Sequence, residues 1–131
     1  MLNIDARFPG GMDNLEELYY AADLLLHPAR NEAAGTVLVE ALCCNLPVLT
    51  TNLCGYAEYI ISSSGGVVLP EKFTLEHWVL AMKKLLTEPE HLLRCRKNIK
   101  DLYKSDFWYS RPAVMADEVI RFAEQKKASE A

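Results

Sequence analysis

The sequence predicts an α/β fold: a partial Rossmann-like parallel sheet of about four strands, with helices on both faces and a helical C-terminal tail. Up to residue 69, short apolar runs alternate with segments that carry helix signals, and the connections between them are short. After Pro70 the pattern changes to helices alone. Repeated strand–helix alternation is typical of parallel, doubly wound sheets. Because no linker or internal repeat divides the chain, residues 1–131 are predicted to form one domain.

Four segments are predicted as strands: residues 4–8, 24–27, 47–50 and 66–69. The last three are short apolar runs of the kind that a parallel sheet buries on both faces. Each of them delivers a loop at its carboxyl end. In an open parallel sheet these loops lie at one edge, and ligands bind there.

Helices are predicted between the strands, over residues 15–22, 35–44 and 56–62. Asp13 or Asn14 can cap the first helix, and Glu16 and Glu17 lie in its first turn, where the helix dipole favours acids. Asn45 is predicted as the left-handed residue that ends the second helix. A turn rich in serine and glycine, at 62–66, ends the third helix.

The residues after Pro70 predict further helices. The first opens near Thr74, and six apolar residues at helical spacing are predicted to face the core: Leu75, Trp78, Val79, Met82, Leu85 and Leu86. Pro89 interrupts this pattern. The remaining predictions are a second helix over 90–103, an aromatic packing loop at 107–109, a third helix over 111–127 and a frayed end at 126–131.

The composition argues against several classes of protein. The 131 residues are half apolar and about a quarter charged, with a net charge of −4, and no basic patch interleaves with aromatic residues. Nucleic acid is therefore not expected as a partner. The apolar runs are shorter than the roughly 20 residues that span a bilayer. The four cysteines lack metal-ligand spacing and are expected to be reduced thiols in the cytosol: Cys43, Cys44, Cys54 and Cys95.

Two glutamates with seven residues between them, Glu32 and Glu40, are the strongest functional signal. Glu32 is predicted in a loop after a strand, and Glu40 in the second turn of the following helix. They flank the free N–H groups of a helix N-terminus, which can bind an anion that carries hydroxyl groups. Gly35 would let the backbone approach a diphosphate, and Thr36 and Val37 would add donors. Glu40 could accept two hydrogen bonds from a vicinal diol such as that of ribose.

Other residues near this edge leave alternatives open. Thr51, Gly55 and Tyr56 follow the next strand and are expected beside the first glutamate. His27, at a strand end, is either a core or rim histidine or a base. A pair of glutamates at this spacing also arises by chance in an acidic chain, so the second one could simply be a solvated helix residue.

Four segments occur in an order that resembles a known family: residues 21–28, 32–41, 46–51 and 54–60. Together they resemble the C-terminal, nucleotide-sugar-binding half of retaining GT-B glycosyltransferases of the family-4, group 1 type, and in particular the branch that builds the lipopolysaccharide core. The resemblance is strong over residues 6–60 and looser to about residue 120, including 109–112. It implies a GT-B C-terminal domain, of which these residues would be an N-terminally incomplete copy.

The resemblance implies a role for each residue of the motif. Glu32 would be the catalytic residue, beside the donor sugar, where its carboxylate helps to stabilise the developing oxocarbenium-like charge. Glu40 would hold the ribose diol, and Gly35, Thr36 and Val37 would bind the diphosphate and sugar hydroxyls. The reaction would transfer a hexose, glucose from UDP-glucose, to a lipopolysaccharide core or similar glycan with retention. No cofactor and no obligatory metal are expected, and no Asp-x-Asp metal motif is present.

The family pattern also implies parts outside these residues. The acceptor would bind through a missing N-terminal domain, and the family's Arg and Lys, which neutralise the departing UDP, are replaced only weakly by Arg7 and Arg30. Without them the isolated chain is expected to be inactive. The alternative is a non-catalytic remnant or self-associating module, and in either case a homodimer through the exposed sheet edge is expected. The full-length enzyme is expected in the cytoplasm, peripheral at the inner face of the inner membrane.

Overall fold

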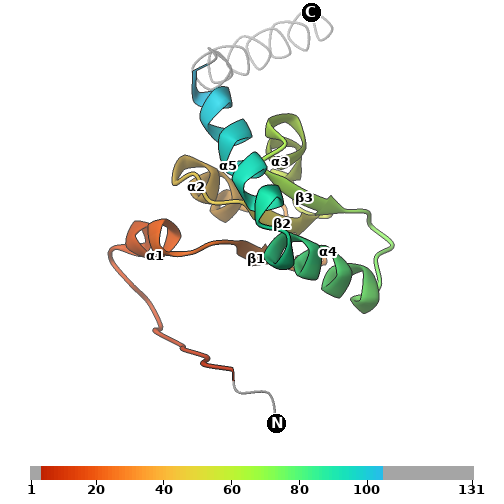
Figure 1. Ribbon diagram of the computed structural model, residues 1–131. Helices are drawn as coiled ribbons and strands as arrows, with labels where there is room; N and C mark the ends of the chain where they lie inside the picture. The colour runs from red at the N-terminus through yellow and green to blue at the C-terminus, as the bar shows by residue number, and fades with distance from the viewer. Residues whose placement is uncertain (1–3, 105–131) are drawn as a thin grey trace, which may run out of the picture.

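A computed structural model describes residues 4–104 of the chain. Its centre is a parallel sheet with the strand order β1-β2-β3: β1 (Leu25–His27), β2 (Val48–Thr51) and β3 (Gly66–Leu69) (Figure 1). Helices α2 and α3 join consecutive strands. The helices are α1 (Leu15–Ala21), α2 (Thr36–Cys43), α3 (Ala57–Ser63), α4 (Leu75–Thr87) and α5 (Pro89–Tyr103). The predicted α/β class with a parallel sheet is confirmed.

The predicted strand at residues 4–8 is wrong. Ile4 and Phe8 are 73% and 93% exposed, and the segment runs apart from the sheet (Figure 1). A short apolar segment becomes a strand only when a neighbouring strand takes up its backbone hydrogen bonds. Within residues 4–104 no strand pairs with this segment, so the described sheet has three strands and not four.

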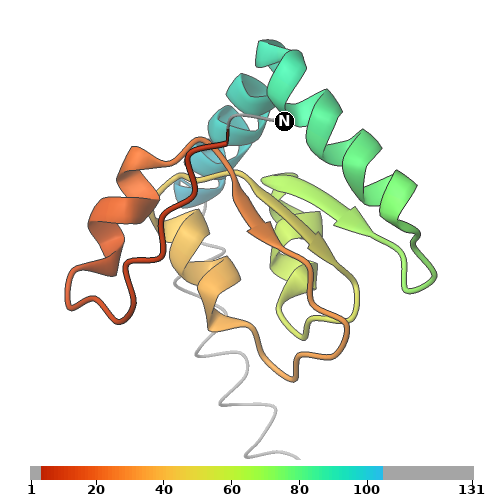
Figure 2. The same ribbon diagram turned by 90° about the horizontal axis from the view of Figure 1, so that it is seen from below.

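Each face of the sheet carries its own hydrophobic cluster. Val48 and Leu49 are neighbours on β2 and are both fully buried, but they join different clusters because side chains alternate across a strand. On one face, α2 and α3 pack together with Ile99 of α5. On the other face, α4 contributes Trp78 and Leu85 (Figure 2). The prediction of helices on both faces is confirmed.

Local signals predict the helix ends to within one or two residues. Asn14 precedes α1 as predicted, although its side chain makes no capping hydrogen bond. Asn45 follows α2 with a left-handed φ of 56°. Thr74 and His77 form a capping box on α4, in which each side chain accepts a 3.3 Å hydrogen bond from the other residue's amide. The predictions for residues 107–109, 111–127 and 126–131 lie outside the described residues.

The apolar stripe predicted for α4 is only partly core. Trp78 and Leu85 are buried, and Met82 packs against the same cluster. The other three residues of the stripe are 74%, 42% and 51% exposed, in the order Leu75, Val79 and Leu86. The six residues cover a wider arc of the helix than three short strands can bury. Helical spacing predicts which residues share a side of the helix, but not how much of that side is covered.

Candidate functional site

The loops that follow β1 and β2 are joined backbone to backbone at the carboxyl edge of the sheet. The Glu32 amide donates to the carbonyl of Leu53 (3.0 Å), and the Glu32 carbonyl accepts from the amide of Gly55 (3.0 Å). At the next residue, the Tyr56 amide donates to the carbonyl of Ala34 (2.8 Å). Glu32 and Cys54 form an isolated parallel bridge between the two loops. The backbone of the first glutamate is therefore fixed, and Gly55 and Tyr56 lie beside it as predicted.

Two glycines allow the loops to lie this close. A Cβ atom at Gly55 would overlap the carbonyl oxygen of Ala33. Gly35 takes a left-handed φ of 77°, and a Cβ atom there would overlap the Sγ atom of Cys54. That thiol in turn donates toward the carbonyl of Ala34 (3.5 Å). The sequence suggested that Gly35 makes room for a ligand; the structure gives it a packing role of its own.

The N-terminus of α2 is open at the same edge. The Leu38 amide donates to the carbonyl of Gly35 (3.0 Å), whereas the amides of Thr36 and Val37 have no acceptor within the described residues. No side chain caps this helix. The helix dipole places partial positive charge at these free amides, which favours an anion there. The three residues predicted to receive a diphosphate thus lie together at an uncapped helix end.

The Glu32 side chain is exposed and lines a hollow of about 520 Å³. The opposite wall comes from the β2–α3 loop and from α3, and it includes Asn52, Gly55 and Glu58. Glu32 therefore sits where a group bound at the start of α2 could reach its carboxylate. Glu58, in the first turn of α3, lines the same hollow.

Glu40 has a partner that the sequence did not predict. The hydroxyl of Tyr19, on α1, donates to Glu40 Oε2 (2.9 Å), while Oε1 accepts no hydrogen bond from the described residues. Tyr19 is only 8% exposed. Burial, and then the hydrogen bond and charge of Glu40, raise the pKa of Tyr19 to about 12. No local pattern could reveal this contact, because 21 residues separate the two side chains.

The two glutamates do not share one hollow. Glu40 lines a separate hollow of about 470 Å³ between α1 and α2, together with Leu15, Tyr19 and Cys43. No residue lines both this hollow and the one at Glu32. The carboxylates instead flank the start of α2, one before the helix and one a turn inside it. A ligand that touched both would have to extend from one hollow to the other.

Two other residues of the predicted edge are occupied or enclosed. Thr51 is fully buried, and its hydroxyl donates to the carbonyl of Ala29 (2.5 Å), so it serves the fold. His27 is half-buried, and its Nε2 atom has no hydrogen-bond partner within residues 4–104. Its backbone carbonyl accepts a hydrogen bond from Thr50 (3.0 Å). The two interpretations of His27, as a core or rim residue and as a base, stay predictions.

The two basic residues considered for this edge differ in their surroundings. Arg7 is exposed and pairs with Asp5 (2.9 Å) in the segment before α1. Arg30 is exposed in the β1–α2 loop, and it forms no ion pair with any described residue. Of the two, Arg30 is the one close in sequence to the Glu32 hollow.

Metal-ligand clusters and membrane-spanning helices are both absent from residues 4–104. No group of three or more His, Cys, Asp or Glu side chains there could hold a metal ion. None of the helices in that range has both the length and the apolar character that crossing a bilayer requires.

The sequence is similar to a known protein family and to individual members of known function. The sequence profile described as Glycosyl transferases group 1 matches residues 1–102. The chain is 42% identical over 113 residues to the lipopolysaccharide glucosyltransferase WaaG of Escherichia coli (strain K12), which covers 86% of this chain and 30% of that protein. It is 33% identical over 84 residues to the D-inositol 3-phosphate glycosyltransferase of Rhodococcus opacus (strain B4), which covers 64% of this chain and 19% of that protein.

A solved structure is also similar. The crystal structure of WaaG, described as a glycosyltransferase involved in lipopolysaccharide biosynthesis, matches with a TM-score of 0.73 and 43% sequence identity. The match covers 82% of this chain and 29% of that chain. These residues therefore span less than a third of the length of the relatives they match.

Proposed function

The chain belongs to the group 1 glycosyl transferases, and we propose that it forms the donor-binding portion of a retaining enzyme. In this proposal the longer enzyme transfers a hexose, glucose from UDP-glucose, to a lipopolysaccharide core or similar glycan. The similarity to WaaG in both sequence and structure supports the acceptor class. One observation carries the donor site: a backbone-fixed glutamate lies beside the uncapped start of α2.

We assign the donor's reacting end to Glu32. Its backbone is held by hydrogen bonds to Leu53 and Gly55, so the side chain that carries the carboxylate starts from a fixed position. A carboxylate held near the anomeric carbon stabilises positive charge as the glycosidic bond to the diphosphate weakens, and such preorganised charge is effective because it needs no reorganisation. The diphosphate would lie on the amides of Thr36 and Val37.

We assign the ribose to Glu40. Tyr19 occupies Oε2, which leaves Oε1 for a ribose hydroxyl. Donation from the tyrosine also restrains the rotamer of the carboxylate. In this arrangement the nucleoside lies toward α1 and the sugar toward the β2–α3 loop, so the donor crosses the start of α2 between two separate hollows. We propose no cofactor and no obligatory metal for this step.

The proposal includes a limit on the isolated chain. The departing UDP carries concentrated negative charge, and the described residues near the edge offer Arg30 but no group of cations. The missing stabilisation lies in the transition state more than in the ground state. We therefore propose that the isolated chain binds the donor but does not turn over, and that the acceptor binds through a domain outside these residues. Glucosyl transfer from UDP-glucose by the purified chain would contradict this part.

Calorimetric titration of the 131-residue chain with UDP and UDP-glucose tests the donor site. The starting protein is expected to bind both, and Glu40→Ala is expected to weaken both by roughly tenfold, because a charged hydrogen bond to the ribose is lost. Glu90→Ala removes an exposed carboxylate from the first turn of α5 and is the matched control. Absence of binding by the starting protein, or equal losses in the two variants, would refute the proposed site.

A self-associating module without turnover is the second candidate, and the free edge of β1 favours it. Within the described residues β1 pairs only with β2, and Leu26 on this strand is 43% exposed. An uncovered edge strand is a template for pairing with a second copy. Sedimentation of the chain is expected to show a dimer, and Leu26→Lys is expected to weaken it. A dimer that binds neither UDP nor UDP-glucose would favour the module over the donor-binding portion.

A further inference from the structure

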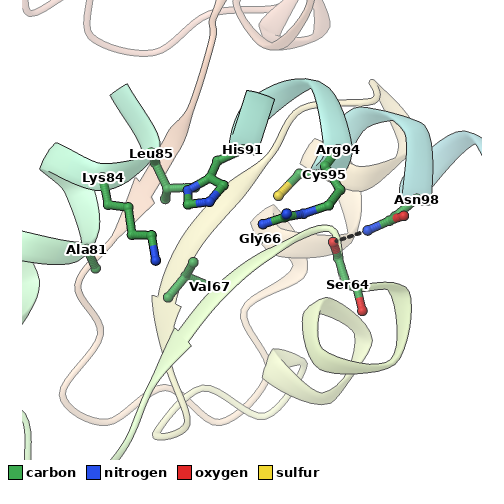
Figure 3. Close-up of a pocket in the computed structure, with 10 residues that line it drawn as sticks. All are labelled: Ser64, Gly66, Val67, Ala81, Lys84, Leu85, His91, Arg94, Cys95 and Asn98. Atoms are coloured by element: carbon green, nitrogen blue, oxygen red, sulfur yellow. Dashed lines mark hydrogen bonds between the residues drawn. The ribbon is translucent and has the colours of Figure 1, made fainter. Parts of the chain in front are cut away.

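A third hollow lies at the opposite end of the sheet from Glu32. It has a volume of about 360 Å³ and is enclosed by the start of β3, the turn before it, and the two helices α4 and α5 (Figure 3). This volume falls within the range of about 300–1,000 Å³ that is usual for small-molecule sites. None of its lining residues belongs to the proposed donor site.

The floor of this hollow is apolar. Val67 of β3, Ala81 and Leu85 of α4, and Cys95 of α5 line it. Leu85 and Cys95 are 2% and 7% exposed, so the floor is continuous with the hydrophobic core. A ligand with a short apolar body would remove the exposed part of Val67 and Ala81 from water, which favours its binding.

The rim is positively charged. Lys84 of α4 and His91 and Arg94 of α5 point into the hollow (Figure 3), and no carboxylate lines it. Such a concentration of cations stands out in a chain whose net charge is −4. Together an ammonium and a guanidinium match a phosphate or carboxylate, the guanidinium through two parallel hydrogen bonds.

Lys84 and Arg94 are not used by the protein itself. Neither forms an ion pair with any residue between 4 and 104, whereas other basic residues of α5 contact aspartates: Arg96 with Asp23 and Lys97 with Asp101. His91 contacts Glu88 (3.4 Å between Nε2 and Oε2) and is the third donor of the rim. Two permanent cations that have no ion-pair partner among residues 4–104 thus lie over one apolar floor.

The wall that carries Arg94 is fixed to the sheet. Asn98, one turn farther along α5, donates its side-chain amide to the carbonyl of Ser64 in the turn before β3 (3.1 Å). Gly66 keeps the strand start close to β2, because a Cβ atom there would overlap the backbone of Val48. The hollow therefore exists before any ligand enters, which lowers the cost of binding.

From these observations we propose that the hollow binds a small amphiphilic anion. Lys84 and Arg94 hold its phosphate or carboxylate head, and its short alkyl body lies against Val67, Ala81 and Leu85. Such a head group belongs either to a free metabolite or to a lipid in a membrane. The two sources share the same chemistry at the rim, and an experiment separates them.

Titration of the 131-residue chain with hexyl phosphate tests the proposal. Hexyl phosphate is expected to bind, and Lys84→Gln and Arg94→Gln are each expected to weaken it by about tenfold. Lys83→Gln is the matched control, because Lys83 carries the same charge on the same helix but does not line the hollow. Inorganic phosphate, without the alkyl body, is expected to bind at least about tenfold more weakly.

Further measurements separate a lipid from a free metabolite as the source of the anion, and they name the results that would contradict the proposal. Cosedimentation with phosphatidylglycerol vesicles that depends on Lys84 and Arg94 supports a lipid source, and binding of hexyl phosphate without vesicle binding supports a free metabolite. No binding of hexyl phosphate, an equal loss from Lys83→Gln, or equal binding of uncharged hexyl glucoside would overturn the proposal. Lys83, Lys84 and Arg94 are all exposed, so circular dichroism is expected to show that the three variants fold.

Discussion

The two ends of this sheet are held in different ways. At the carboxyl edge, the loops around Glu32 and Gly55 are joined by backbone hydrogen bonds, and a missing side chain allows the contact. At the amino end, the start of β3 is also packed closely through Gly66, but the helical wall of the hollow is held by a side chain, the Asn98 amide that reaches the carbonyl of Ser64. An atom added at Gly55 would disturb the bonded backbone of both loops, whereas removing the Asn98 side chain would remove only the hydrogen bond that it makes. The difference predicts that substitutions in the loops of the carboxyl edge cost more stability than the loss of a side chain from the helical wall of the hollow.

Gly55→Ala is expected to have the largest effect. The added Cβ atom would overlap the carbonyl oxygen of Ala33, and this atom belongs to a backbone that is itself bonded in place. We expect a loss of about 4 kcal/mol in the free energy of unfolding, measured by urea denaturation. Gly11→Ala is the control, because no atom lies within 4 Å of a Cβ built there, and it should change stability by less than about 0.5 kcal/mol. Equal effects would break the comparison.

Leu85→Ala and Leu86→Ala compare two neighbours on α4, beside the hollow. Leu85 is 2% exposed and Leu86 is 51% exposed, although the sequence predicted both as core. Because only Leu85→Ala leaves a cavity, it is expected to cost about 3 kcal/mol, and Leu86→Ala less than about 1 kcal/mol. The same denaturation measurement checks both. A large loss for Leu86→Ala would mean that the exposed side of α4 is covered in solution.

Tyr19→Phe tests the hydrogen bond between Tyr19 and Glu40 in the candidate donor site. The variant loses the hydrogen bond donated to Glu40, and its free energy of unfolding near neutral pH is expected to be lower by about 1.5 kcal/mol. The variant should also bind UDP-glucose more weakly, because the carboxylate of Glu40 is no longer oriented by the tyrosine hydroxyl. A variant that binds UDP-glucose as tightly as the starting protein would remove Tyr19 from the proposed site.

The pH dependence of stability gives the same contact a second test. The pKa of Tyr19 rises from 10.0 in the unfolded reference to about 12 in the folded protein. Above pH 10 the unfolded chain loses a proton that the folded protein keeps, so this contribution is present below pH 10 and is lost as the pH rises toward 12. The stability difference between the starting protein and Tyr19→Phe should therefore narrow from pH 9 to pH 11. A constant difference would contradict the contact.

Asn98→Ala is expected to cost about 1 kcal/mol of stability, less than Gly55→Ala, Leu85→Ala or Tyr19→Phe, because one neutral hydrogen bond to Ser64 is lost from a half-buried position. Its effect on the hollow should be clearer, since the wall that carries Arg94 is released and the affinity for hexyl phosphate falls. Lys100→Ala, on an exposed position of the same helix, is the control and should change neither quantity. A loss as large as that of Gly55→Ala would erase the difference between the two ends.

Local chemistry made most of the elements predictable. Strand β3 has the predicted bounds, and Asn45 ends α2 in the predicted left-handed conformation. These features depend on residues within one or two turns of each other, so the sequence contains the information. The same holds for the placement of Glu32 before a helix N-terminus and Glu40 inside the helix, since both follow from the position of one strand and one helix. Their roles in binding a donor stay a prediction.

Distant contacts could not be predicted in this way. Residues 4–8 look like a strand but find no neighbour in the described sheet, and Leu86 has core spacing but no partner that covers it. Tyr19 donates a hydrogen bond to Glu40, and Lys84 and Arg94 line one hollow with β3, because the fold brings separate helices and strands together. The sequence alone determined the succession of strands and helices, since caps and periodicity act locally. The tertiary structure decided which side chains are covered, which carboxylate has a partner, and which cations face a common cavity, because these depend on elements far apart in the chain.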